Sequence, residues 1–563
     1  MTPAGTAHIL TAARAWLAQD PDPETRQELD VLIRDAEGGS EPALDELHSR
    51  FDTRLEFGTA GLRGRIEAGS ARMNRVLVGQ AAAGLAAYLA EREPDARPSI
   101  VIGYDGRRNS RVFATDTAEI MAGAGIRAIV LPRQLPTPVL AFAVRHFDVS
   151  AGVMVTASHN PPADNGYKVY LGGADEGSQI VSPSDAEIEA QILRVAASAN
   201  VLELPRSTDY ETADETVVDA YIAATAAVMT SEPVPMEVVY TAMHGVGWET
   251  FSRVVAAAGL TLPHSVVAQQ EPDAEFPTVA FPNPEEPGAL DLSYALARET
   301  GAELIVANDP DADRLSIAIP DASSTEGYRQ LSGNEVGALL GWRAAVLNAE
   351  QGNAGGVLAC SIVSSPALSA VASEYDLDFV ETLTGFKWVS RVPNLIFGYE
   401  EALGYLVNPR TVRDKDGISA AIDFLSMACF LAGHNLTVQS ALDAFAEKFG
   451  YFASDQLSLR VTDLSDIAAI MAHLRANPPA ELGGVGVETI EDLRDGFGDL
   501  PPTDALRFRL TDGSRVMARP SGTEPKIKFY LDVKRPVERK DEASVVLAAV
   551  KSDLSAIAAA ATA

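Results

Sequence analysis

Short, continuous apolar runs recur along the chain and are separated by turn-forming residues, the pattern of buried β-strands. The clearest runs occupy residues 99–103, 126–131, 151–155, 236–241 and 303–308. Apolar residues three or four positions apart predict helices at 109–121, capped by Asn109 or Ser110, and at 249–258. Strands alternating with helices predict parallel pairing through helical crossovers, so the pattern favours an α/β fold.

The first fifty residues carry the helical period instead. Ile9, Ala13 and Trp16 fall on one helical face, and Leu29 and Ile33 on another, with an Asp-Pro break at 22–23 between them. We expect a helical extension over residues 1–50 that packs on the rest of the chain and carries no chemistry. A chain of 563 residues is too long for one hydrophobic core, so it should divide into three or four domains.

The charge balance narrows the possible partners. A net charge of −33 argues against nucleic acid and anionic membranes, which need basic faces. Cys360 and Cys429 lie in apolar runs and are expected to be buried thiols, which fits a reducing cytosol. The N-terminus lacks the pattern of a signal peptide. The longest apolar run, 418–432, contains Asp423 and predicts a buried helix instead of a membrane span.

Segment 155–161 (VTASHNP) displays a serine, Ser158, on a loop at the end of the strand at 151–155. Pro161 and Pro162 prevent the loop from continuing as a regular element. The small residues before Ser158 leave room for a bulky group to approach its hydroxyl. A plain Ser/Asn turn is the better explanation of this segment when it is taken alone.

Segment 309–314 (DPDADR) follows the strand at 303–308 and contains three aspartates. In extended backbone, alternate side chains point the same way, so the carboxylates of Asp309, Asp311 and Asp313 should converge. Like charges this close repel unless a cation lies among them, and oxygen ligands favour Mg²⁺ or Ca²⁺. An EF-hand is excluded because Arg314 and Pro320 stand where glycine and glutamate are required. A solvated acidic turn is the remaining alternative.

Several further loops contain residues suited to binding anions. Segment 55–64 has three glycines and places Arg63 where it could reach an anion, although a plain glycine turn is as good an explanation. Asp105 and Arg107 end the strand at 99–103, where α/β sheets place ligands. Residues 136–138 (PTP) form a rigid turn before the next helix. Later in the chain, segment 166–168 (GYK) is expected to bring Lys168 back near Ser158.

The second half of the chain adds three polar loops. Segment 384–388 places Lys387 beside an aromatic residue, and Glu400 and Glu401 in a glycine-bounded loop can accept hydrogen bonds from several hydroxyls. Asp416 is a plausible N-cap of the following helix. Segment 519–526 (RPSGTEPK) offers guanidinium, hydroxyl and main-chain N–H donors to a phosphate, whereas a P-loop motif is absent from the sequence. A solvated acidic loop is the alternative for Glu400 and Glu401, and an Arg/Ser turn is the alternative for segment 519–526.

Taken together, four segments resemble the signature loops of one family, the α-D-phosphohexomutases, which includes phosphoglucomutase and phosphomannomutase. They are 156–161 (TASHNP), 309–314 (DPDADR), 398–404 (GYEEALG) and 519–525 (RPSGTEP). They occur in the family's order and span nearly the whole chain. The N-terminal region and segment 57–64 (FGTAGLRG) are most similar to the longer branch of bacterial α-phosphoglucomutases and the animal phosphopentomutase/phosphoglucomutase type.

The resemblance implies an α/β protein with four domains around a central cleft: three related α/β domains with mixed sheets and a C-terminal α+β domain. After the extension at 1–50, the expected domains are 51–208, 209–322, 323–448 and 449–563. They would carry, in order, a phosphoserine loop, a metal-binding loop, a sugar-binding loop and a phosphate-binding loop.

The resemblance also implies roles for individual residues. Ser158 would carry a phosphoryl group and hold Mg²⁺ together with Asp309, Asp311 and Asp313. Catalytic positions near the transferring phosphoryl group would be Arg63, Lys168 and Arg314, with Lys168 or His159 as general acid/base. The substrate-binding positions would be Glu400, Glu401, Lys387, Lys415, Arg519, Ser521, Gly522 and Thr523.

The implied reaction interconverts hexose 1-phosphate and hexose 6-phosphate, with glucose, mannose or both as the sugar. Phosphoserine would give its group to the sugar, and the resulting 1,6-bisphosphate, which also serves as activator, would turn round and return its other phosphate to Ser158. Cationic side chains in the phosphate-binding loops would offset the net negative charge of the chain. The expected partners are small sugar phosphates, and the chain should be a cytoplasmic monomer or homodimer.

The sugar loop departs from the family's pattern. Many relatives have Glu-x-Ser there and some a histidine just after it, but this chain has Ala402 and Leu403. Sugars that differ by one hydroxyl are discriminated weakly, so a phosphopentomutase or a bisphosphate synthase of the same family remains an alternative. Outside the family, a metal-dependent sugar phosphatase or a sugar-phosphate-binding regulator would use some of the same residues.

Overall fold

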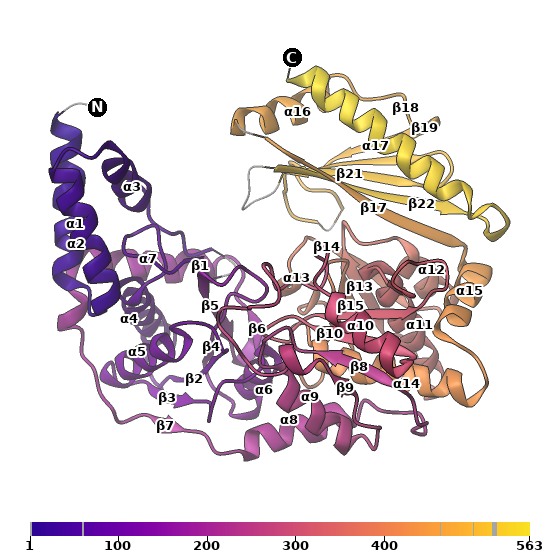
Figure 1. The fold of residues 1–563 in the computed structure, drawn as a ribbon, viewed down its shortest axis with the longest axis horizontal. Helices are drawn as coiled ribbons and strands as arrows, with labels where there is room; N and C mark the ends of the chain where they lie inside the picture. The colour runs from indigo at the N-terminus through magenta and orange to yellow at the C-terminus, as the bar shows by residue number, and fades with distance from the viewer. Residues whose placement is uncertain (1–2, 59–60, 462, 499, 521–525, 563) are drawn as a thin grey trace. The chain divides into compact units, whose positions relative to one another are not determined.

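Figure 1 shows the chain as a computed structural model, which describes residues 3–58, 61–461, 463–498, 500–520 and 526–562. Contacts within the chain divide it into two units. Unit 1 contains Met1–Gln330 and Gly404–Cys429, and unit 2 contains Leu331–Leu403 and Phe430–Ala563.

Three helices begin unit 1: α1 (Pro3–Gln19), α2 (Pro23–Glu37) and α3 (Glu41–Phe51). Asp22 caps α2 by accepting the N–H of Glu24. Pro23 is the first residue of α2, a position where the fixed φ of proline suits a helix. Trp16, Leu29 and Leu47 are buried in one cluster with residues of the following domain. The helical extension was predicted from the sequence, including its packing role.

The first sheet of unit 1 is mixed and has the order β1-β5-β4-β2-β3-β7, with β6 beside β5. Its strands are β1 (Leu62–Arg65), β2 (Ser99–Tyr104), β3 (Arg127–Val130), β4 (Ala151–Val155), β5 (Asp164–Leu171), β6 (Ser178–Gln179) and β7 (Glu211–Thr212). Its helices are α4 (Arg75–Arg92), α5 (Ser110–Gly123), α6 (Thr137–His146) and α7 (Ser184–Ser198). Strands β4, β2 and β3 are parallel, as the strand–helix–strand order predicted.

One detail of this sheet differs from expectation. Asn109 precedes α5, but its side chain makes no capping hydrogen bond, because the residue has a left-handed backbone with φ of 64°. The Asn109 backbone therefore does not have the extended conformation that is typical of a capping residue.

The second sheet of unit 1 has the order β12-β11-β10-β8-β9. Its strands are β8 (Val238–Thr241), β9 (His264–Ser265), β10 (Leu304–Asn308), β11 (Leu315–Pro320) and β12 (Tyr328–Gln330). Helices α8 (Thr216–Ala226), α9 (Gly247–Ala257) and α10 (Asp291–Thr300) accompany it. Strand β16 (Gly404–Leu406) and most of α14 (Gly417–Gly433) also belong to unit 1, although they come much later in the chain.

Unit 2 begins with the parallel strands β13 (Val357–Ser361), β14 (Asp378–Thr382) and β15 (Leu395–Glu400). The helices of this part are α11 (Gly333–Glu350), α12 (Ala367–Glu374), α13 (Phe386–Val389) and α15 (Val438–Phe449). An antiparallel sheet of order β17-β22-β21-β20-β19-β18 follows. It contains β17 (Tyr451–Arg460), β18 (Glu481–Leu482), β19 (Val485–Asp492), β20 (Leu506–Leu510), β21 (Arg515–Pro520) and β22 (Lys526–Arg535).

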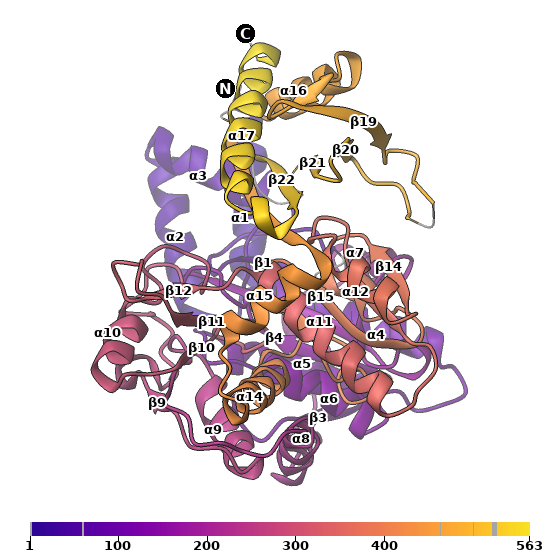
Figure 2. The ribbon, with the colours of Figure 1, turned by 90° about the vertical axis from the view of Figure 1, so that its right-hand side faces the viewer.

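Helices α16 (Leu464–Ala476) and α17 (Glu542–Ala561) pack against this antiparallel sheet, as Figures 1 and 2 show. Helix α17 is long and apolar enough to cross a membrane by composition alone. Its residues Leu547, Val550 and Leu554 are buried at helical spacing, so one face of the helix packs against the sheet. The predicted fold class, mixed α/β domains followed by an α+β domain, is confirmed.

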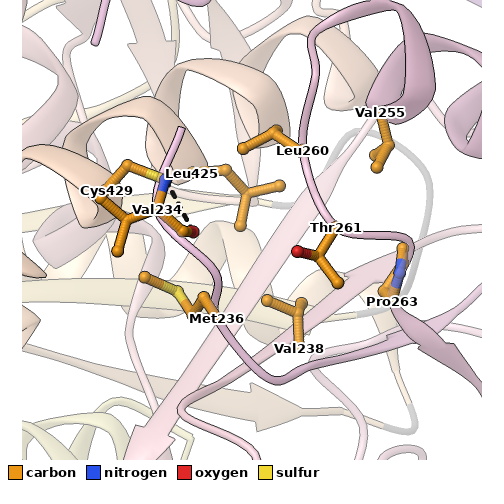
Figure 3. A pocket seen from close by; sticks show the side chains of 9 residues that line it. All are labelled: Val234, Met236, Val238, Val255, Leu260, Thr261, Pro263, Leu425 and Cys429. Carbon is orange, nitrogen blue, oxygen red and sulfur yellow. Dashed lines mark hydrogen bonds between the residues drawn. The ribbon is translucent and has the colours of Figure 1, made fainter. Parts of the chain in front are cut away.

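A small apolar cavity lies between β8, α9 and α14 in unit 1 (Figure 3). It has room for about one water molecule. The Cys429 thiol lies at its wall and accepts the N–H of Val234 at 3.5 Å. Cys360 and Cys429 are both buried and unpaired, as the apolar runs around them predicted.

Candidate active site

Ser158 lies in the loop that follows β4, and its hydroxyl meets two chemically useful groups. Its Oγ donates to Asp309 Oδ2 at 2.7 Å and lies 3.1 Å from His159 Nδ1. The residue is 2% exposed and has a left-handed backbone, with φ of 51°. Such a backbone costs a non-glycine residue about 1–2 kcal/mol, so the surrounding structure must hold the turn.

Arg107 supplies much of that support. Its guanidinium donates to the main-chain carbonyls of Ser158, Asn160 and Pro161, at 2.5, 2.6 and 2.9 Å. Asp105 in turn accepts the N–H of Arg107 at 3.0 Å. The position of Arg107 at the end of β2 suggested a ligand-binding role, but these donors are directed at the serine loop.

Asp309, Asp311 and Asp313 are fully buried in the turn after β10, and they present oxygens within 4.8 Å of one another. The carboxylates converge as predicted, but the predicted cause is wrong. The segment is a tight turn and not an extended strand, and Ala312 at its centre has φ of 55°. The turn folds the three side chains back into one place.

Two lysines neutralise part of this charge. Lys168 on β5 donates to Asp311 Oδ2 at 2.8 Å and to Asp313 Oδ2 at 3.0 Å, and Lys415 Nζ lies 2.8 Å from Asp313 Oδ2. Burial works to lower the pKa of Lys168, but the two aspartates outweigh it and raise that pKa. Lys168 is therefore a fixed positive charge in this arrangement.

The groups nearest the Ser158 hydroxyl have shifted pKa values. Burial first, and then the other two aspartates, raise the pKa of Asp309 well above its ordinary value. Burial and the neighbouring guanidinium groups of Arg314 and Arg63 hold the pKa of His159 well below its ordinary value. His159 is therefore a neutral imidazole at pH 7, and it can accept a proton from the serine hydroxyl.

The unsatisfied oxygens of the acidic turn test whether a metal ion fits. Asp311 Oδ1 and Asp313 Oδ1 are buried and have no hydrogen-bond partner among the described residues. Asp309 uses its two oxygens for the Ser158 hydroxyl and the N–H of Arg314. A buried polar atom without a partner is costly, and a cation would satisfy both carboxylates at once. The donor set, which is all oxygen, suits a hard divalent cation.

Two predicted arginines lie in the same unit. Arg63 on β1 donates to Asn160 Oδ1 at 3.2 Å, so it reaches the serine loop. Arg314 lies directly after the acidic turn, with its Nη1 3.9 Å from Glu285 Oε2. The structure thus brings together Ser158, His159, Lys168, Arg63, Arg314, Asp309, Asp311 and Asp313 in unit 1.

Lys415 was grouped with the substrate-binding positions, but it joins this unit as well. It lies in the loop between β16 and α14, and Asp416 next to it caps α14 by accepting the N–H groups of Ile418 and Ser419 at 3.0 Å. The predicted cap is therefore confirmed. Lys415 directly precedes this cap, and its Nζ lies 2.8 Å from Asp313 Oδ2.

The predicted sugar-binding residues lie in unit 2. Glu400 at the end of β15 accepts the N–H of Gly385 at 2.6 Å. Glu401 Oε2 accepts the hydroxyls of Ser361 and Ser364, at 3.1 and 3.0 Å. Glu401 is thus bound by serines of its own domain, and one carboxylate oxygen of Glu400 accepts a main-chain N–H from the residue before α13.

The other predicted substrate residues of unit 2 are described in part. Lys387 Nζ on α13 lies 5.5 Å from the centre of the Trp388 ring, and Arg519 is half-buried near the end of β21. Three predicted phosphate-binding residues lie outside the described ranges: Ser521, Gly522 and Thr523.

Thr137 is a contact of the acidic turn that the sequence did not reveal. Its hydroxyl donates to Asp311 Oδ2 at 2.7 Å. The Pro-Thr-Pro sequence identified a rigid turn, but its partner lies 174 residues further along the chain. A single sequence contains no signal for a pair so far apart.

Comparisons with known proteins cover almost the whole chain. Family models of phosphoglucomutase/phosphomannomutase match as α/β/α domain I at residues 54–198, domain II at 219–322, domain III at 332–449 and the C-terminal domain at 457–549. A probable phosphomannomutase of Haemophilus influenzae is 57% identical over 463 residues, covering 82% of this chain and 93% of that protein. The phosphopentomutase of Homo sapiens is 36% identical over 576 residues, covering 93% and 91%.

A solved structure shares the fold. The putative phosphomannomutase of Thermus thermophilus matches with a TM-score of 0.68 and 22% identity, covering 89% of this chain and 99% of that one.

Proposed function

The chain belongs to the phosphoglucomutase/phosphomannomutase family, whose members named above are phosphomutases and hence isomerases, and from that premise we propose a specific reaction. The protein interconverts hexose 1-phosphate and hexose 6-phosphate, of glucose, mannose or both, through a phosphoserine at Ser158 and a 1,6-bisphosphate. The observation that carries this proposal is the Ser158 hydroxyl, placed 2.7 Å from an oxygen of the acidic turn and 3.1 Å from a neutral imidazole.

The residues of unit 1 can perform the transfer at the serine end. When phosphoserine reacts, the bond between phosphorus and Ser158 Oγ breaks, a bond to the sugar hydroxyl oxygen forms, and Oγ gains a proton. In the return step Oγ attacks the phosphorus of the other phosphate, and the bond between that phosphorus and its sugar oxygen breaks. Oγ loses its proton, which His159 Nδ1 can take, and the released sugar oxygen gains a proton. Arg63 and Arg314 spread the charge of the transferring group, and Lys168 fixes the acidic turn.

A divalent cation, proposed to be Mg²⁺, would be held by Asp309, Asp311, Asp313 and a phosphoserine oxygen. When bound, it supplies charge neutralisation for the transferring phosphoryl group. Glu400 and Lys387 would bind the sugar end, and Arg519, with the loop that follows it, would bind the distant phosphate. A sugar 1,6-bisphosphate would be needed to phosphorylate the resting enzyme.

Pentose phosphates are a second candidate substrate class. Ala402 stands where many relatives have a serine, so one sugar contact is absent or supplied by another residue. The phosphopentomutase of Homo sapiens aligns with 93% of the chain. A bisphosphate synthase would use the same residues. A sugar phosphatase would instead release phosphate to water.

One experiment separates these possibilities. Coupled assays with glucose 1-phosphate, mannose 1-phosphate and ribose 1-phosphate, each with a trace of the matching bisphosphate, are run beside a free-phosphate assay. We expect turnover on a hexose 1-phosphate without phosphate release. Faster turnover on ribose 1-phosphate would favour a phosphopentomutase, and stoichiometric phosphate release would contradict the mutase proposal. We further propose that the protein acts in the cytoplasm as a monomer or homodimer, without nucleic acid or membrane partners.

A further inference from the structure

Helix α6 of the first family domain touches the acidic turn of the second. Its first residue, Thr137, makes two hydrogen bonds to Asp311: the main-chain N–H donates to the carbonyl oxygen at 2.9 Å, and the hydroxyl donates to Oδ2 at 2.7 Å. Thr137 has no exposed surface. Two bonds from one residue fix both the backbone and the carboxylate of Asp311.

The local sequence makes this contact rigid. Pro136 and Pro138 flank Thr137 and restrict the backbone at the start of α6. Threonine is β-branched, so its side chain has few rotamers. The helix behind it is anchored by buried side chains, among them Val139 and Leu140. The hydroxyl is therefore a preorganised donor.

The two carboxylate oxygens of Asp311 have different surroundings. Oδ2 receives both side-chain donors, the Thr137 hydroxyl at 2.7 Å and the Lys168 ammonium at 2.8 Å. Oδ1 is buried without a hydrogen-bond partner among the described residues. One oxygen is thus occupied by the protein, and rotation of the carboxylate is blocked, so the other oxygen keeps a fixed direction.

We propose that Thr137 is a positioning residue for the divalent cation, which holds Asp311 so that Oδ1 is presented as a ligand. This inference deepens the proposed function, because it rests on a cation bound by the aspartates of the acidic turn. Donors behind a metal ligand fix its orientation, and their loss costs about 10–100-fold in metal affinity. Lys168 neutralises charge at the same oxygen, whereas Thr137 adds direction without charge.

Metal binding to the full chain tests the proposal without relying on turnover. Protein freed of metal with a chelator is titrated with Mg²⁺ by calorimetry and with Mn²⁺ by electron paramagnetic resonance. Thr137→Val removes the hydroxyl at nearly constant volume, and Thr137→Ser retains it. The matched control is Thr117→Val in α5, since Thr117 is equally buried and donates to the Phe113 carbonyl at 2.8 Å, away from the acidic turn.

We expect Thr137→Val to bind both ions at least tenfold more weakly, Thr137→Ser to bind within about threefold of the unmodified protein, and Thr117→Val to bind normally. Equal affinity in Thr137→Val would overturn the inference. Weakening by Thr137→Ser as strong as by Thr137→Val would also overturn it, because the hydroxyl would then not be the cause. If Thr137→Val does not fold by circular dichroism, Thr137→Ala, which adds no atom, is titrated instead.

The titration of the unmodified protein distinguishes a failure of the proposed cation from a failure of the proposed role of Thr137. If it binds neither ion, the cation in the proposed function is wrong, and the role of Thr137 is refuted with it. If it binds normally and Thr137→Val binds equally well, only the positioning role fails, and the mutase proposal stands.

Discussion

Replacing Asp416 by asparagine should remove a pH-dependent loss of stability from unit 1. Asp416 is 1% exposed, caps α14, and accepts the hydroxyl of Tyr221 at 3.0 Å. Burial, the largest effect, raises its pKa from 3.8 to about 6, against the hydrogen bonds from Ser419 and Tyr221 that lower it. The folded state therefore holds this proton more tightly than the unfolded state does.

The difference between the folded and unfolded pKa of Asp416 sets the direction and size of the effect on the free energy of unfolding. Below pH 3.8 the carboxyl is protonated in both states, and its favourable contribution to folding is complete. As the pH rises, the unfolded chain ionises first, so the free energy of unfolding falls until the pH passes about 6. A difference of roughly two pH units at about 1.4 kcal/mol each gives a loss of about 3 kcal/mol at neutral pH.

Asparagine is neutral at every pH and retains the Oδ1 acceptor that receives the N–H groups of Ile418 and Ser419. Differential scanning calorimetry should therefore show Asp416→Asn unfolding a few degrees above the unmodified protein at pH 7.5, with little difference at pH 4. Asp214→Asn is the control: Asp214 is exposed, and the hydrogen bonds from Thr216 lower its pKa, so the variant should gain nothing at pH 7.5. An increase in the unfolding temperature of Asp416→Asn that is the same at both pH values would refute the reasoning.

Other substitutions test the acidic turn. Lys168→Met leaves Asp311 and Asp313 without their shared ammonium, so it should cost about 3–5 kcal/mol of stability without metal. Added Mg²⁺ should then raise the melting temperature more than in the unmodified protein, and an equal rise would contradict the charge argument. Gly245→Ala would place a Cβ 2.2 Å from the Pro310 backbone, so it should displace the turn and lower both thermal stability and Mg²⁺ affinity. Unchanged Mg²⁺ affinity in a folded Gly245→Ala protein would show that the turn tolerates the shift.

Much of the fold could be predicted because its signals are local. The apolar run at 151–155 is a strand, and Ser158 follows it on a loop, as a strand broken by prolines requires. The three aspartates converge as expected, but through a turn with Ala312 in left-handed backbone, a conformation that the extended-strand argument did not include.

Long-range contacts could not be predicted in the same way. Lys415 reaches Asp313 because the segment that begins at β16 belongs to unit 1. Thr137 reaches Asp311 within unit 1, from family domain I to family domain II. The local sequence does not identify the partner of Lys415 or of Thr137, and only the packed structure shows that they meet. The reaction was inferred from the family resemblance. The hydrogen-bond donors that hold the metal-binding aspartates were identified from the geometry.

The central claim is a covalent phosphoryl group on Ser158, and phosphopeptide mass spectrometry tests it most directly. The full chain is incubated with Mg²⁺ and glucose 1,6-bisphosphate, digested and mapped, with Ser158→Ala as the control. We predict one phosphoryl group, on Ser158, which exchanges with the phosphate of added hexose 1-phosphate. Phosphate on a different residue, or full mutase turnover by Ser158→Ala, would contradict the account.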